Sequence, residues 1–320
     1  MVSSDAPVSD LGENALVALL KERFPAAPGE LGIGDDAAVF APRGPRIVFT
    51  TDSMVEGVDF ELSYFSGSDV GWKVIAINAS DIAAMGGDPW KALITLCMPR
   101  STRTGFVQDL IDGVVAAAEA MDVEIVGGDL SEADRIVVGA AALGTTDQAI
   151  PRSGARMGDA ICVTGCFGGS SGGLALLQQD PTAEGPLVTR HKRPRPRLAE
   201  ARVLRELRPS AMMDVSDGLV VDLDRLLVSS GKGCEVDPTR IPVDPALSVG
   251  DDRTAALFGG EDFELLLTLR REDVTAAASA LESLGTRFSE IGVITEDEAL
   301  IGGRPLSRLK EQGWDHLQSP

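Results

Sequence analysis

The stretch Asp69-Val-Gly-Trp-Lys-Val-Ile-Ala-Ile-Asn-Ala-Ser-Asp-Ile-Ala-Ala-Met85 predicts a buried helix that ends at Gly86-Gly87. One helical face carries Val70, Val74, Ile77 and Asp81. A second apolar stripe consists of Trp72, Ile75, Ala79 and Ile82. A helix that is apolar on two faces packs against other elements on both of them, so we expect this segment to lie inside a domain.

Asp81 is the exceptional residue of this helix. An ionised carboxylate in a largely buried helix costs several kcal/mol unless a cation or another partner faces it. Lys73, two turns earlier, is one candidate partner, and a metal ion is the other.

Short apolar strands and helices alternate on both sides of this helix, which predicts an α/β protein with mixed sheets. In the first half we expect a helix at 104–121 and strands at 47–52, 91–98, 123–126 and 135–143. A turn-rich stretch at 145–158 divides the chain into domains 1–147 and 148–320. In the second half we expect helices at 170–178, 218–229 and 272–284, and strands at 159–164, 211–213, 263–269 and 288–294. The proline-rich, basic segment 180–196 is expected to be a loop.

The charge balance limits the classes of partner. The 320 residues include 49 Asp and Glu against 29 Lys and Arg, a net charge of −20. Such a surface repels phosphate backbones, so we expect no nucleic-acid partner. Four cysteines with a single close pair, and two histidines, do not indicate a zinc site. No apolar run is long enough to span a membrane and no signal peptide is visible, so we expect a cytoplasmic protein.

Several carboxylates follow apolar or glycine-rich stretches at expected strand ends, where they could converge. They are Asp35, Asp36, Asp52, Asp129, Asp214 and Asp217. Converging carboxylates suit Mg²⁺, which would allow an acidic protein to bind a nucleoside triphosphate. Each also has an ordinary structural reading, as a helix cap or a turn residue.

Two glycine-rich segments give weaker signals. Gly32-Ile-Gly-Asp-Asp-Ala37 matches a dinucleotide-binding pattern but lacks the strand and helix that would flank it, so we reject that reading. The loop Gly165–Gly173 could bind phosphate through its backbone N–H groups, or could equally be a close-packed turn.

Taken in order, the motifs of this chain resemble those of the thiamine-monophosphate kinase family. That family belongs with aminoimidazole ribonucleotide synthetase, selenophosphate synthetase and a hydrogenase-maturation protein. The matching stretches are Gly32-Ile-Gly-Asp-Asp36, Thr50-Thr-Asp52, Asn78-Ala-Ser-Asp-Ile-Ala-Ala-Met-Gly86, Gly127-Gly-Asp129, Arg152-Ser-Gly154, Asp214-Val-Ser-Asp-Gly218, Gly259-Gly-Glu-Asp262 and, more weakly, Gly313-Trp-Asp-His316.

The resemblance implies two α/β domains, with the N-terminal sheets of two subunits packing into a barrel across a homodimer. It also implies a nucleotide site between the halves that holds several Mg²⁺ ions. The implied metal ligands are Asp36, Thr50, Thr51, Asp52, Asp81, Asp129, Asp214 and Asp217. ATP would be contacted by Gly128, Asp129, Arg152 and Ser216, and the thiamine moiety by Glu261 and Trp314.

One position departs from the family pattern. Val55-Glu-Gly-Val-Asp-Phe60 has Asp59 where the family often has histidine, so Asp59 is a candidate contact of the thiazolium cation.

The expected reaction is in-line transfer of the γ-phosphoryl group of ATP to thiamine monophosphate, without a phosphoenzyme. Asp52, Asp129 and Arg152 would be the catalytic residues, because positioning and charge neutralisation suffice for this chemistry. Replacing Asp52 or Asp129 by Asn is expected to remove most turnover. The alternatives are a sister ATP-using reaction, such as aminoimidazole ribonucleotide synthesis, and a non-catalytic nucleotide- or metal-binding protein. Selenophosphate synthesis is disfavoured because no cysteine precedes Gly32, and thiocyanate formation because the sequence ends in Gln-Ser-Pro.

Overall fold

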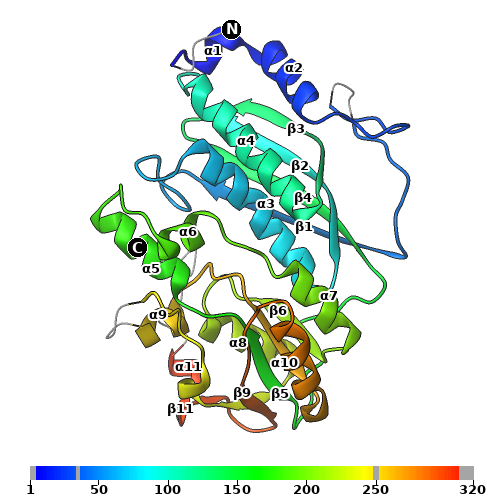
Figure 1. Ribbon diagram of the computed structural model, residues 1–320, viewed down its shortest axis with the longest axis vertical. Coiled ribbons are helices and arrows are strands. Elements are labelled where there is room, and N and C mark those ends of the chain that lie inside the picture. Colours follow the sequence, from blue (N-terminus) through cyan, green and yellow to red (C-terminus); the bar gives the residue numbers. More distant parts are fainter. Residues whose placement is uncertain (1–4, 34–36, 248–251, 310–320) are drawn as a thin grey trace. The chain divides into compact units, whose positions relative to one another are not determined.

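The computed structural model describes residues 5–33, 37–247 and 252–309, which form two compact units. Unit 1 comprises Met1–Ile82 and Asp88–Asp147, and unit 2 comprises Ala83–Gly87 and Gln148–Pro320. Each unit is a mixed α/β structure built on one sheet (Figure 1).

Unit 1 is built on a four-stranded sheet in the order β1-β4-β2-β3. Its central strand β4 pairs antiparallel with β1 and with β2, while β2 and β3 run parallel. The elements are α1 Val8–Leu11, α2 Glu13–Arg23, β1 Arg46–Val55, α3 Gly67–Ala84, β2 Asp88–Met98, α4 Thr104–Met121, β3 Glu124–Glu132 and β4 Val137–Thr146.

Helices α3 and α4 lie across one face of this sheet (Figure 1). Along β1 the exposed positions alternate with less exposed ones, as expected for a strand with one covered face. The opposite face keeps large apolar side chains in contact with solvent: Phe49 is 69% exposed, Ile47 49% and Leu93 43%. The sheet of unit 1 therefore presents one apolar face that its own helices do not cover.

The backbones of α3 and α4 approach each other through glycine. A Cβ on Gly71 would lie 2.1 Å from the carbonyl oxygen of Leu110, and one on Gly113 would lie 2.1 Å from that of Ser68. Neither distance is compatible with a side chain. The close approach buries α3 almost throughout, as the sequence predicted, although Asp81 remains partly exposed.

Unit 2 contains a seven-stranded sheet in the order β11-β10-β7-β9-β5-β8-β6, in which all pairs except β7 with β10 are antiparallel. Its strands are β5 Ala160–Thr164, β6 Ala211–Asp214, β7 Gly233–Val236, β8 Leu265–Leu269, β9 Phe288–Thr295, β10 Leu300–Ile301 and β11 Arg304–Pro305. Its helices are α5 Gly169–Gln179, α6 Pro186–Lys192, α7 Leu198–Glu206, α8 Leu219–Ser230, α9 Asp252–Phe258, α10 Val274–Glu282 and α11 Leu306–Leu309, with short 3₁₀ turns at Pro238–Arg240 and Arg271–Asp273.

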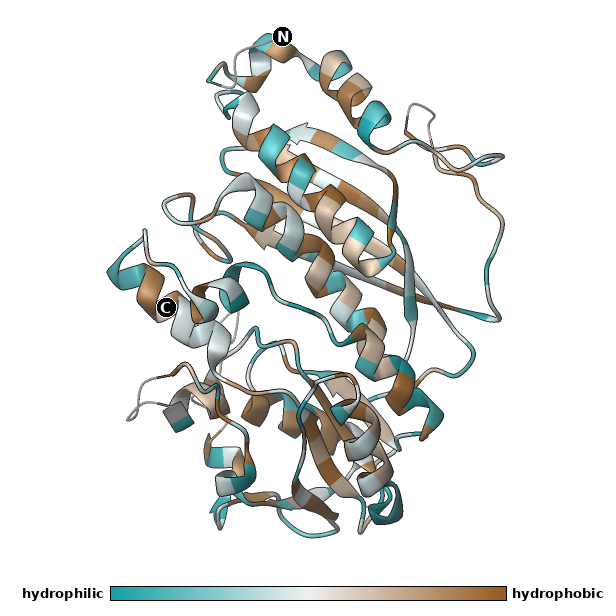
Figure 2. Ribbon diagram, in the orientation of Figure 1, coloured by the Kyte–Doolittle hydropathy of each residue, from teal (hydrophilic) through white to brown (hydrophobic). Residues whose placement is uncertain are grey.

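Both faces of this sheet are buried. Ile161 and Val163 of β5 belong to a core cluster with residues of α8, whereas Ala160 and Cys162 belong to a cluster with residues of α7 and α10. Strands covered on both faces are apolar at consecutive positions, as the brown colour of the central strands shows (Figure 2).

The helix α6 corrects one prediction. The segment 180–196 is not a continuous loop, because Pro186 begins a helix of seven residues inside it. Proline suits the first position of a helix, where no intrahelical hydrogen bond from its nitrogen is needed. The basic residues of the segment follow that start.

The α3–α4 contact gives a stability prediction. Gly113→Ala should lower the free energy of unfolding by about 1–3 kcal/mol, because the new methyl group meets the backbone of α3. Urea unfolding followed by circular dichroism measures the change.

The matched control is Ala116→Gly at an exposed position of α4, which should cost about 0.5–1 kcal/mol through helix propensity alone. A Gly113→Ala protein as stable as the parent would contradict the close approach of the two backbones.

Candidate functional site

The first group of predicted site residues lies where β1 meets α3 in unit 1. Thr50 and Asp52 occupy alternate positions of β1, on the less exposed side of the strand. The Thr50 hydroxyl donates a 2.5 Å hydrogen bond to Oδ2 of Asp81, so a hydroxyl faces this carboxylate from the neighbouring strand. The backbone N–H of Asp52 donates to Oδ1 of Asn78, at 3.1 Å. These contacts place Asp52 and the Thr50–Asp81 pair at one strand–helix junction.

Thr51 lies on the other face of β1. Its hydroxyl donates to the carbonyl oxygen of Ala140 on β4, at 2.9 Å, and the residue is exposed. Strand geometry therefore directs its side chain away from that of Asp81.

Gly128 and Asp129 lie on β3, at the opposite edge of the same sheet. A Cβ on Gly128 would lie 1.9 Å from the carbonyl oxygen of Ile94, which accounts for the glycine at this position. The register pairs Asp52 with Ala140, Ala140 with Ile94, and Ile94 with Gly128. Three strand spacings, about 14 Å, thus separate Asp52 from the Gly128–Asp129 pair within one chain.

The oxygen donors at the β1–α3 junction fit a hard cation such as Mg²⁺, which commonly takes only one or two carboxylates from a protein. Within the described ranges, no group of three or more His, Cys, Asp or Glu side chains is arranged around a common metal position.

An apolar pocket of about 720 Å³ adjoins Gly128 and Asp129 in unit 1. Residues of α2, α4 and all four strands line it, together with Phe24 and Phe40, and they include Phe49 and Leu93 of the uncovered sheet face. This volume lies in the range of small-molecule sites.

The second group lies in unit 2, on the loop that follows β6. Asp214 ends that strand and is 7% exposed, and Asp217 is partly buried. The carboxylate of Asp222 on α8 accepts hydrogen bonds from the N–H groups of Ser216, at 3.0 Å, and Asp217, at 2.9 Å. Arg225 pairs with both Asp217, at 2.5 Å, and Asp222, at 2.7 Å. These contacts fix the loop that carries the predicted metal ligands.

Asp222 was missed by sequence reasoning, although its sequence context contains a signal. Leu219-Val-Val-Asp-Leu places one acid in an apolar run, and the side chain is fully buried. Burial raises the pKa of this carboxyl to about 6, while the N–H of Asp217 and the charge of Arg225 act to lower it.

Glu261 lies beside this loop. Its backbone N–H donates a 2.7 Å hydrogen bond to the carbonyl oxygen of Ser216. Its φ of 66° lies in the left-handed region, which a non-glycine residue adopts at a cost of order 1 kcal/mol or more. Glu261, the predicted thiamine contact, is therefore hydrogen-bonded directly to Ser216, the predicted ATP contact.

The other predicted residues are placed as follows. Arg152 is exposed on the loop after β4, and its carbonyl oxygen accepts a 3.3 Å hydrogen bond from Ser230. Asp59 accepts a 2.8 Å hydrogen bond from the N–H of Val55 and closes the turn after β1. Asp36 and Trp314 lie outside the described residues.

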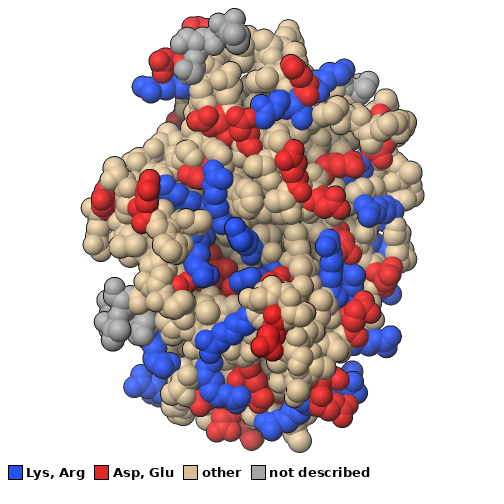
Figure 3. Space-filling model, viewed as in Figure 1, with Lys and Arg blue, Asp and Glu red and all other residues tan. Residues whose placement is uncertain are grey.

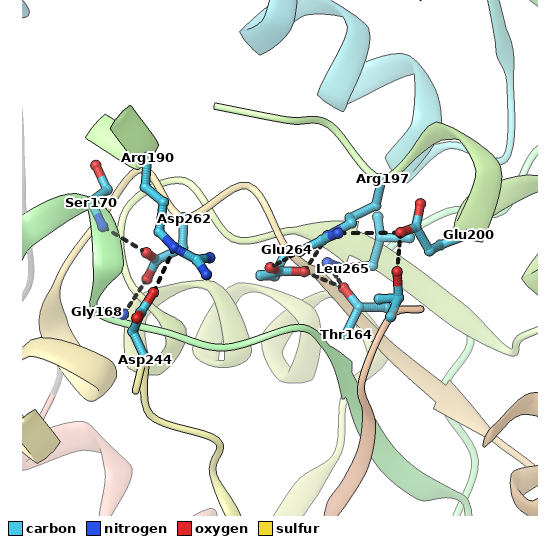
Figure 4. Close-up of polar contacts among 11 residues, drawn as sticks. Thr164, Gly168, Ser170, Arg190, Arg197, Glu200, Asp244, Asp262, Glu264 and Leu265 are labelled. Carbon is cyan, nitrogen blue, oxygen red and sulfur yellow. Dashed lines mark hydrogen bonds and ion pairs between the residues drawn. The ribbon is translucent and has the colours of Figure 1, made fainter. Parts of the chain in front are cut away.

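The glycine-rich loop before α5 is occupied by a protein carboxylate. The N–H groups of Gly168 and Ser170 donate to the two oxygens of Asp262, at 2.7 and 3.1 Å (Figure 4). These N–H groups are satisfied within the protein, so the loop is a close-packed turn rather than a phosphate cradle. Burial raises the pKa of Asp262 to about 7, assisted by the negative charge of Glu264 and opposed by the two N–H donors.

A neighbouring network is structural. Arg197 donates a 2.6 Å hydrogen bond from Nε to Glu264, which also accepts a 2.7 Å bond from Thr164 (Figure 4). Arg190 pairs with Asp244 at 2.7 Å. Each of these buried carboxylates has a cationic partner, as burial requires.

Both halves of the chain are similar to known proteins. The family model for the N-terminal domain of AIR synthase related protein matches residues 34–146, and that for the C-terminal domain matches residues 156–303. The thiamine-monophosphate kinase of Aquifex aeolicus is 33% identical over 321 residues, which cover 97% of this chain and 99% of the relative. This chain belongs to the thiamine-monophosphate kinase family.

Solved structures agree with this assignment. The thiamine-monophosphate kinase of Stenotrophomonas maltophilia superposes with a TM-score of 0.83 at 32% identity, over 91% of this chain and 96% of the other. AaThiL, solved in complex with AMPPCP and TMP, gives a TM-score of 0.78 at 33% identity, over 96% and 97%. The family resemblance predicted from the sequence motifs is confirmed. No helix in the described parts of the chain is long and apolar enough to cross a membrane.

On the face drawn in Figure 3, basic side chains gather near the centre of the view, and acidic side chains are interspersed over the rest of it.

The raised pKa of Asp262 gives a pH prediction. The folded carboxyl binds its proton more tightly than the unfolded one, so the contribution of Asp262 to stability is fully present below about pH 4 and is lost as pH rises through about 7. Asp262→Asn keeps a hydrogen-bond acceptor but cannot ionise. Between pH 4 and 7, the wild-type protein should lose about 1–3 kcal/mol of unfolding free energy relative to this variant.

Urea unfolding at several pH values measures this difference. Parallel pH profiles for the two proteins would show that Asp262 ionises in the folded protein as readily as in the unfolded chain.

Proposed function

We propose that this chain transfers the γ-phosphoryl group of ATP to thiamine monophosphate, giving thiamine diphosphate and ADP in the cytoplasm. The observation that carries the proposal is the hydrogen bond between Glu261 and Ser216, because a phosphotransferase must hold acceptor and donor side by side. Nearly full-length similarity to thiamine-monophosphate kinases supports it, as does the AMPPCP and TMP complex of AaThiL.

The proposed Mg²⁺ ligands all offer oxygen donors. When bound, Mg²⁺ neutralises the charge of the two phosphorylated substrates and stabilises the transferring phosphoryl group. The ligands are Asp36, Thr50, Thr51, Asp52, Asp81, Asp129, Asp214 and Asp217, which the sequence motifs indicate. The β1–α3 junction supports the first part of this set, because it already brings Thr50 and Asp81 into contact.

The protein residues would act by binding and orientation. Gly128 and Asp129 would contact ATP at the β3 edge of the unit 1 sheet. Arg152 is exposed and would pair with the phosphates of ATP. The acceptor phosphate is already ionised near neutral pH, so direct in-line transfer requires neither a general base nor a phosphoenzyme. Asp59, Glu261 and Trp314 are the proposed contacts of the thiamine moiety.

A homodimer would complete the site. The uncovered face of the unit 1 sheet carries Ile47, Phe49 and Leu93, and two such faces packed together would bury them in a barrel. A two-fold axis parallel to the strands would bring β1 of one subunit beside β3 of the other. These two edge strands would then be neighbours, whereas about 14 Å separates Asp52 from the Gly128–Asp129 pair within one chain.

The test is a reaction of the purified protein with ATP, Mg²⁺ and thiamine monophosphate, with chromatographic separation of the thiamine phosphates. Thiamine diphosphate and ADP should appear in equal amounts, and EDTA should abolish both. Binding of ATP without any product would contradict the proposal and favour a sister reaction or a non-catalytic role.

A further inference from the structure

The segment Gly259–Glu264 is held firmly against the loop after β6. Besides the bond from Glu261 to Ser216, the N–H of Phe263 donates to Val215 at 2.9 Å. The N–H of Val215 donates back to Glu264 at 2.8 Å. Both Glu261 and Phe263 have positive φ values, 66° and 50°. Such departures from ordinary backbone geometry persist when the surroundings fix them, and they are concentrated at functional sites.

The three acidic residues of this segment have different surroundings. Asp262 binds the N–H groups at the start of α5, and Glu264, 2% exposed, pairs with Arg197 (Figure 4). Glu261 keeps 33% of its side chain exposed. Its carboxylate can therefore meet a ligand from solution.

The contact that orients this carboxylate comes from α6. Nδ1 of His191 lies 3.2 Å from Oε2 of Glu261 and 3.1 Å from Oγ of Ser170, and the His191 side chain is 3% exposed. A carboxylate only accepts hydrogen bonds, so the contact is a hydrogen bond when Nδ1 carries the proton. A buried ring between two fixed elements has little rotational freedom, so it can hold Glu261 in one orientation.

We propose that His191 is a positioning residue for acceptor recognition, whose Nδ1–H holds the Glu261 carboxylate toward the cationic, amino-bearing ring system of thiamine monophosphate. The inference rests on the proposed function, because it assigns Glu261 to that acceptor. It gives α6 a role in substrate selection.

Loss of this positioning should affect KM for the acceptor rather than kcat. The ring system is remote from the reacting phosphate, so misdirecting Glu261 weakens binding of the acceptor in the ground state and the transition state alike. Such a loss raises KM for the acceptor and leaves kcat nearly unchanged. ATP does not contact Glu261 in this assignment, so its KM should not change.

Two polar variants separate positioning from packing. The amide of Asn can occupy the place of Nδ1, whereas the longer Gln places its amide near Nε2. His191→Gln should raise KM for thiamine monophosphate about 10-fold, with kcat and KM for ATP within about 2-fold of wild type. His191→Asn should stay within about 3-fold in KM for the acceptor, and Ser170→Ala should leave this KM unchanged.

The comparison is made on the full chain at saturating co-substrate, with melting temperatures recorded for each variant. If His191 only fills space, Gln, which is closer in size, should be tolerated better than Asn, and that order would overturn the inference. Equal KM values for wild type and His191→Gln would also overturn it, with the proposed function intact. Absence of thiamine diphosphate formation by the wild-type protein would instead remove the proposed function and this inference together.

Discussion

The four-stranded sheet of unit 1 sets the distance between two of the predicted metal ligands. Two strands stand between β1, which carries Asp52, and β3, which carries Asp129. Hydrogen-bonded strands have a fixed spacing, so no side-chain rotation lets both carboxylates bind one cation within a chain. The same sheet has one face covered by α3 and α4 and one apolar face that they leave exposed. A two-fold pairing of the exposed faces would resolve both features, since it would bury apolar surface and join the two edges.

In unit 2, buried carboxylates fix the two segments that carry predicted site residues. Asp222 binds the backbone of the loop after β6, and Asp262 binds the turn before α5. Each carboxylate is expensive to bury, and each accepts hydrogen bonds from two backbone N–H groups. The outcome is that Ser216 and Glu261 share a hydrogen bond. In the proposed assignment, this bond would link donor and acceptor recognition through the backbone.

Periodicity predicted the mixed α/β character and most elements, including the bounds of α4. It failed where tertiary contacts decide. Strand β3 continues through Gly127 and Gly128, which pair with Leu93 and Ile94 of β2, and α6 begins at a proline within a basic segment. The motifs identified the family, but they could not reveal His191, whose contact joins residues far apart in sequence.

The most direct measurement uses two subunits with different tags, co-expressed and purified through both tags. A heterodimer of Asp52→Asn with Asp129→Asn subunits has one intact site if the sites are shared, so it should retain about half of wild-type activity. A heterodimer of wild-type with doubly substituted subunits should then be inactive. The opposite pattern, with activity only in the second heterodimer, would contradict a site shared between subunits, and so would failure to recover any heterodimer.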